Sequence, residues 1–143
     1  MSYREKFAWL CLVAMLIAYT PYFVHAHLNP PPEGTLPDLS HMARFGLTAA
    51  AHAIMVLIGL AYLRFAARGE GPLKPDERDR AIDRRSMQVG YWLLMIGLVV
   101  VGVISPFTES GWTLVNGALF FLVLSETARS LVAVWSYRRG WHG

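Results

Sequence analysis

Two ionisable residues of opposite charge lie inside a long apolar stretch near the end of the sequence. Glu126 and Arg129 are three positions apart, and segment 113–135 contains no other charged residue. In a helix this spacing places both side chains on one face. A charged side chain at the centre of a bilayer costs about 2.5 to 3.5 kcal/mol, so each residue must be shielded or functional. The pair is either a proton, cation or subunit-contact site, or a structural ion pair whose arginine reaches toward the headgroups.

A histidine in another apolar stretch is the second candidate. His52 shares a helical stripe with Thr48 and Met55, and its expected depth is close to that of Glu126. A histidine and a carboxylate joined by water can relay protons. Alternatively, His52 hydrogen-bonds across helices to Asn116 or Ser105. The predicted intramembrane polar set is therefore Glu126, Arg129, His52 and Asn116.

A third candidate is a group of histidines between the first two apolar stretches. His25, His27 and His41 have Glu33 and Asp38 close by, and a run of prolines follows the first two. Histidines two positions apart can converge on zinc or copper when the chain is extended, which those prolines favour. The spacing matches no established metal motif, so the alternative is a set of polar residues at the membrane interface.

Other cofactor and enzyme signatures are absent from the sequence. Cys11 is the only cysteine, which excludes disulfide, Cys-x-x-Cys and thiolate-cluster chemistry within the chain. A bis-histidine haem needs two inward-facing histidines at similar depth, and only His52 is embedded, so haem is not predicted. There is no phosphate loop, nucleophile triad or dinucleotide fingerprint. Apart from the zinc or copper alternative at the outer histidines, we therefore predict no cofactor and no enzymatic activity.

The elements that must position these residues are four long apolar segments. The chain has 143 residues and is 55% hydrophobic. A helix needs about 20 apolar residues to cross a hydrocarbon core of about 30 Å, and lipid offers no partners for unpaired backbone groups. We predict a single transmembrane domain, 1–143, folded as an all-α, antiparallel four-helix bundle. Its predicted spans are 7–24, 45–66, 87–107 and 113–135, with an outer loop at 25–44 and a cytoplasmic loop at 67–86. Short similarities between 20–22 and 105–107, and between 67–69 and 138–140, suggest two pseudo-repeated hairpins.

The basic residues predict the orientation of this bundle. Of the 13 Lys and Arg residues, only Arg44 falls in the two predicted outer connections, whereas 11 fall near the termini or the central loop. The positive-inside rule then places both termini in the cytoplasm of a bacterial cell, with the chain in its cytoplasmic (inner) membrane. The bases border apolar runs rather than forming a soluble basic face, so no nucleic-acid partner is predicted.

A charged stretch precedes the third span. Pro75 and the acids that follow it are typical of a helix start, so the third helix is expected to run on to Phe107 and to protrude into the cytoplasm. The stretch is predicted to contact anionic lipid headgroups or to recruit a cytoplasmic partner. This cytoplasmic motif consists of Asp76, Glu77, Arg78, Asp79, Arg80, Asp83, Arg84 and Arg85.

Several short motifs carry a resemblance to a known family. They are Asp76-Glu77-Arg78-Asp79, Ala81-Ile82-Asp83, Gly90-Tyr91-Trp92, the opening Arg4-Glu5-Lys6-Phe7-Ala8-Trp9, and Tyr137 to Gly140. Together they resemble a family of small, uncharacterised prokaryotic four-helix membrane proteins with an Asp-Glu-Arg-Asp motif before the third span. The resemblance implies a four-span fold and a cytoplasmic charged motif. It implies no activity, and the histidines at 25 and 27 have no counterpart in it.

From the sequence alone we expect an integral-membrane accessory or interaction protein, partnered by the bilayer and by itself or another membrane protein. The alternative is a small proton- or cation-coupled transporter that uses Glu126, Arg129 and His52. A third possibility is an outward-facing metal-binding membrane protein.

Overall fold

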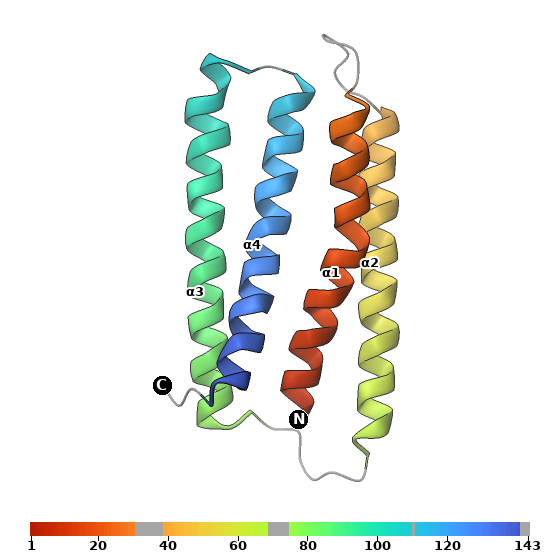
Figure 1. Ribbon diagram of the computed structural model, residues 1–143, viewed down its shortest axis with the longest axis vertical. Helices are drawn as coiled ribbons and strands as arrows, with labels where there is room; N and C mark the ends of the chain where they lie inside the picture. The colour runs from red at the N-terminus through yellow and green to blue at the C-terminus, as the bar shows by residue number, and fades with distance from the viewer. Residues whose placement is uncertain (31–38, 69–74, 110, 141–143) are drawn as a thin grey trace.

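The computed structural model describes residues 1–30, 39–68, 75–109 and 111–140, and these fold into helices (Figure 1). The helices are α1 (Tyr3–Leu28), α2 (Leu39–Ala66), α3 (Glu77–Val99) and α4 (Trp112–Arg138). A π-helical turn, η1 (Val100–Ile104), and a 3-10 turn, η2 (Ser105–Phe107), prolong α3. Each of the four helices is long and apolar enough to cross a membrane, which confirms the predicted all-α, four-helix fold and is consistent with a multi-pass membrane protein.

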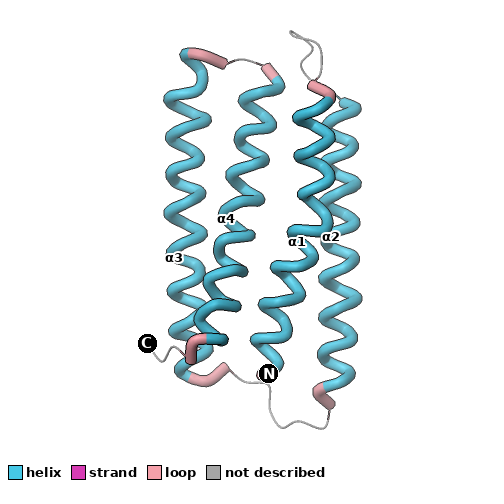
Figure 2. The backbone as a smooth tube through the Cα atoms, viewed as in Figure 1, coloured by secondary structure: helices cyan, strands magenta, loops and turns pink. Residues whose placement is uncertain are grey.

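The four helices stand side by side in an order that differs from their order in the chain. Helix α3 packs on α4, α4 on α1, and α1 on α2, whereas the outer helices α2 and α3 have at most marginal contact (Figures 1 and 2). Both termini lie at the same end of the bundle (Figure 1). We call this the basic end, because Arg4, Arg78 and Arg138 lie there at the tips of α1, α3 and α4. The two hairpins therefore meet through α1 and α4.

Helix α1 is longer than predicted. The first span was predicted to end at Val24, but the helix continues past Pro21 and ends at Leu28. A proline removes one backbone hydrogen bond, and long apolar helices can tolerate that loss. The end is set instead by Asn29, whose backbone N–H and side-chain amide donate to the carbonyl of His25 at 3.0 and 3.1 Å. Outer loop 25–44 therefore begins and ends with helical residues.

Local sequence explains both ends of the third helix. Asp79 N–H donates to Oδ1 of Asp76 at 2.6 Å, and Asp76 N–H donates to Oδ2 of Asp79 at 3.2 Å, which forms a capping box. At the other end, Pro106 lacks an N–H, and its ring would clash with the carbonyl four residues before it in a regular helix. The backbone widens instead, so that Ser105 N–H bonds to the carbonyl of Val100. The helix then ends at Phe107, as predicted.

Small residues allow close approach between the helices of each hairpin. A Cβ added to Gly97 of α3 would lie 2.5 Å from Cβ of Phe121 on α4. A Cβ added to Gly59 of α2 would lie 2.5 Å from the Cδ atoms of Leu10 on α1. Because glycine has no side chain, the two helices of each hairpin can approach closely, as is common in membrane proteins.

Candidate functional site

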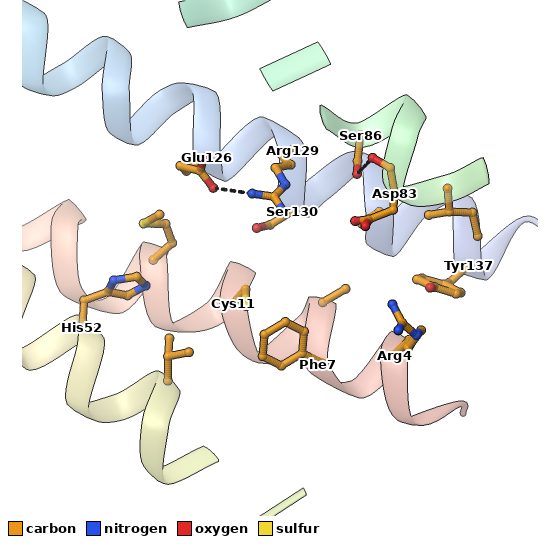
Figure 3. A pocket seen from close by; sticks show the side chains of 15 residues that line it. Arg4, Phe7, Cys11, His52, Asp83, Ser86, Glu126, Arg129, Ser130 and Tyr137 are labelled. Atoms are coloured by element: carbon orange, nitrogen blue, oxygen red, sulfur yellow. Dashed lines mark hydrogen bonds and ion pairs between the residues drawn. The ribbon is translucent and has the colours of Figure 1, made fainter. Parts of the chain in front are cut away.

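A cavity of about 390 Å³ lies between the four helices (Figure 3). It begins beside Arg4 and Tyr137, in the first turn of α1 and the last turn of α4. It reaches His52 and Glu126, which lie near the middle of α2 and α4. The cavity therefore extends from the basic end to about half the height of the bundle. It is lined by Arg4, Phe7, Ala8, Cys11, Met15, His52, Val56, Ile82, Asp83, Ser86, Glu126, Arg129, Ser130, Ala133 and Tyr137.

The two hairpins contribute different chemistry to this lining. Helices α1 and α2 contribute mostly apolar side chains, whereas α3 and α4 contribute hydroxyl and carboxylate groups (Figure 3). The apolar residues of the first hairpin are Phe7, Ala8, Cys11, Met15 and Val56, and the polar residues of the second are Asp83, Ser86, Glu126, Arg129, Ser130 and Tyr137. The first hairpin also contributes Arg4 and His52, and the second contributes Ile82 and Ala133, so one wall is mainly apolar and the other mainly polar.

The predicted ion pair forms on the polar wall. Nη1 of Arg129 donates to Oε2 of Glu126 at 3.3 Å, within one turn of α4. The two side chains remain 39% and 48% exposed, so neither is sealed inside protein. An ion pair contributes most when it is desolvated with good geometry, and this one is half open. The pair can therefore break without unfolding the helix that carries it.

His52 shares the cavity with Glu126, but it does not form the cross-helix bond that was the alternative expectation. In the described ranges of the chain, Nε2 of His52 and Oδ1 of Asn116 have no hydrogen-bond partner. The reason is their different heights. At 1.5 Å per residue, His52 lies about 20 Å along α2 from its first residue, whereas Asn116 lies about 6 Å along α4. The ring of Tyr19 packs against His52 instead, with the centroids 5.5 Å apart.

Contacts that sequence reasoning missed join four residues beside the basic end of the cavity. Asp79 accepts a 2.9 Å hydrogen bond from the hydroxyl of Tyr137 and lies 3.3 Å from Nε of Arg4. Nη2 of Arg78 donates to the carbonyl of Tyr137 at 3.2 Å. We call Arg4, Arg78, Asp79 and Tyr137 the basic-end cluster. It ties together the tips of α1, α3 and α4, three segments far apart in the sequence.

The cytoplasmic motif divides into residues with different positions. Asp76 caps α3, and Arg78 and Asp79 belong to the basic-end cluster. Asp83 is the member that lines the cavity. Glu77, Arg80, Arg84 and Arg85 have exposed side chains, and Nε of Arg84 donates to the carbonyl of Arg80. Their contact with lipid headgroups or with a cytoplasmic partner stays a prediction.

The outer histidines do not adopt the extended arrangement that was expected. His25 and His27 lie in the last turn of α1, where residues two positions apart point to nearly opposite sides. His25 contacts Asn29 and the guanidinium of Arg44. Nε2 of His41 donates to the carbonyl of Asn29 at 3.2 Å, so His25 and His41 both contact Asn29. The side chain of His27 is exposed.

This arrangement bears on the predicted zinc or copper site. Across the described residues, no group of three or more His, Cys, Asp or Glu side chains gathers in a metal-binding arrangement. The acids at 33 and 38 lie outside the described residues. Metal binding by His25, His27 and His41 stays a prediction, without support from the helical placement of the first two.

Comparison with known proteins adds no assignment. No protein-family model, no curated protein and no solved structure matches the chain. The functional argument therefore rests on the cavity and on the residues that line it.

Proposed function

We propose that the chain is a multi-pass protein of the bacterial cytoplasmic membrane, built from two antiparallel transmembrane hairpins. The four apolar helices support membrane insertion. The concentration of Lys and Arg at the basic end supports a cytoplasmic position for that end and for both termini.

Within this topology, we propose that the chain is a small proton- or cation-coupled transporter in which Glu126 is the binding site. A single observation carries the proposal: one cavity joins Glu126, Arg129 and His52 to the basic end. Its volume of about 390 Å³ can hold several water molecules, and its polar wall offers them partners. Water in this space would connect a carboxylate at mid-height with the cytoplasm. Ionisable residues at such depth are the usual sites of proton and ion transfer.

The half-open ion pair suits an exchange of partners. A proton or monovalent cation arriving at Glu126 competes with the Arg129 guanidinium, which lies 3.3 Å away on the same helix. When the carboxylate is neutralised, the Arg129 guanidinium is released from it. When the cation leaves, the pair reforms. His52 lines the same cavity, and its buried Nε2 has no hydrogen-bond partner among the described residues.

Reconstitution in liposomes tests this proposal. Proton, Na⁺, K⁺ and tetramethylammonium gradients are imposed in turn, and internal pH and ion content are followed for wild type, Glu126→Gln and protein-free vesicles. We expect the wild type to dissipate at least one gradient faster than empty vesicles, and Glu126→Gln to be slowed to the empty-vesicle rate. Glu77→Gln is the matched control, because Glu77 is exposed at the start of α3 and does not line the cavity. Equal rates for all preparations under all four gradients would overturn the proposal.

A second candidate, an accessory protein that binds itself or another membrane protein, is favoured by α2. The most apolar 18-residue window of this helix contains no buried residue, whereas each of the other three contains some. Photo-crosslinking from Leu57 on α2, which is 63% exposed, should then give one discrete product in native membranes. The same crosslinker at Leu98 on α3, which is 64% exposed, should give none. Crosslinking only to lipid at both positions would remove this candidate.

A further inference from the structure

The two walls of the cavity indicate the chemical class of its ligand. An inorganic cation would leave Phe7 and Met15 facing water, and a purely apolar ligand would strip water from Ser130 and Glu126 without replacing it. Small-molecule sites combine an apolar lining with a few polar groups that fix orientation, in volumes of about 300 to 1,000 Å³. A cavity of about 390 Å³ with one wall of each kind suits a small amphipathic molecule.

The charges around the cavity indicate the sign of the ligand. Arg4 is paired with Asp79, and Arg129 is paired with Glu126. Asp83 lines the same space, and among the described residues it has no ion-pair partner. Asp83 is therefore a lining carboxylate whose charge no described cation pairs with. A ligand with a single positive charge would neutralise it.

The position of Asp83 fits a role in holding a cationic group. It lies on the polar wall near the basic end, and with Ser130 it faces Phe7 and Cys11 across the cavity (Figure 3). A ligand whose charged group contacts Asp83 can therefore lay an aromatic or alkyl body on the apolar wall. We propose that the cavity binds amphipathic organic monocations, with Asp83 as their counter-charge. The inference rests on the proposed function and names its substrate class.

The single cysteine of the chain provides the assay. Cys11 lines the cavity, so a bound ligand should slow its alkylation by a water-soluble maleimide. The probe is the styryl dye 4-(4-dimethylaminostyryl)-N-methylpyridinium. Its neutral analogue, which lacks the N-methyl group, has nearly the same shape. The full chain is assayed in nanodiscs, and Cys11→Ala gives the background.

The expected result has two parts. In the wild type, the cation should protect Cys11 at a concentration about tenfold lower than the neutral analogue, because one close charge pair separates them. Asp83→Asn should raise the protective concentration of the cation about tenfold and leave that of the neutral analogue unchanged. Asp83→Glu should keep the preference for the cation. Glu77→Gln, an exposed acid of the same helix outside the cavity, should behave like the wild type.

The outcomes separate this inference from the proposed function. Equal protection by the cation and its neutral analogue in the wild type would overturn the inference. That result would not bear on the proposed ion flux through Glu126. An unchanged cation preference in Asp83→Asn would overturn the role of Asp83. If unliganded wild-type Cys11 does not react with the maleimide at all, the water-filled cavity is wrong, and both proposals fail.

Discussion

The hydroxyl of Tyr137 donates a 2.9 Å hydrogen bond to Oδ1 of Asp79, which lies 58 positions earlier in the chain. The same carboxylate accepts the backbone N–H of Asp76 and pairs with Arg4. One side chain, 16% exposed, thus fixes the first turn of α3 against the last turn of α4 and the first turn of α1. These three helix tips form the basic end of the cavity.

Tyr137→Phe should lower the free energy of unfolding by about 1.5 to 3 kcal/mol, because it removes a hydrogen bond to a charged acceptor. The measurement is an SDS titration in mixed micelles. Tyr62→Phe is the control, since Tyr62 is 71% exposed, and it should change stability by less than about 0.5 kcal/mol. Equal stability of Tyr137→Phe and wild type would show that the bond does not hold the basic end together.

Gly97→Ala should destabilise the protein more than Gly59→Ala. At position 97 the new Cβ meets Cβ of Phe121, which the backbone holds in place, whereas at position 59 it meets the flexible end of Leu10. Overpacking costs about 1 to 3 kcal/mol, and alanine recovers about 1 kcal/mol of helix propensity. We therefore expect a net loss at Gly97 and a change near zero at Gly59 in the same unfolding assay. A greater loss at Gly59 would contradict this account of the helix contacts.

Exchanging the charges of the intramembrane pair separates its structural role from its transport role. Glu126→Arg alone places two arginines 3 residues apart and should cost about 1 to 2 kcal/mol, less than a fully buried pair because the site is half open. Adding Arg129→Glu should restore most of that stability. The exchanged pair should nevertheless lose ion flux, since the carboxylate has moved one turn along α4. Full flux in the exchanged protein would mean that the pair is structural only.

Single cysteines test the orientation. In a Cys11→Ala background, a cysteine at exposed Glu109 should react with an impermeant maleimide added to intact cells, and a cysteine at exposed Glu77 should react only after the cells are opened. The reverse pattern would place the basic end outside the cell. The cavity would then face the outer solution, and the direction of the proposed transport would have to be reversed.

Much of the fold follows from local signals in the sequence. Pro75 and the acids after it predicted the start of α3, and four apolar runs predicted four helices, because each signal acts within a few residues. Helix α1 continues past the predicted end of the first span at Val24, because Pro21 weakens one turn of a long apolar helix without ending it. The extended conformation expected for His25 and His27 came from the prolines that follow them, but both histidines lie in the last turn of α1.

The site was only partly predictable. Glu126, Arg129 and His52 stand out because a polar residue in an apolar run is costly, and the structure places all three on one cavity. The sequence alone could have excluded a bond between His52 and Asn116, because the two residues lie at different heights along their predicted helices. The contacts of Asp79 with Arg4 and Tyr137 join residues that are distant in the chain, and no local pattern encodes them.

The two hairpins meet along the contact between α1 and α4, which we call the seam, and this contact can act as a hinge. The walls of the cavity belong to different hairpins, and these hairpins touch mainly along that seam. Tilting one hairpin against the other must change the distance between the walls. The width of the cavity and the angle between the hairpins therefore change together. A molecule that bridges the walls acts as a spacer between the hairpins, and its size sets the angle between them.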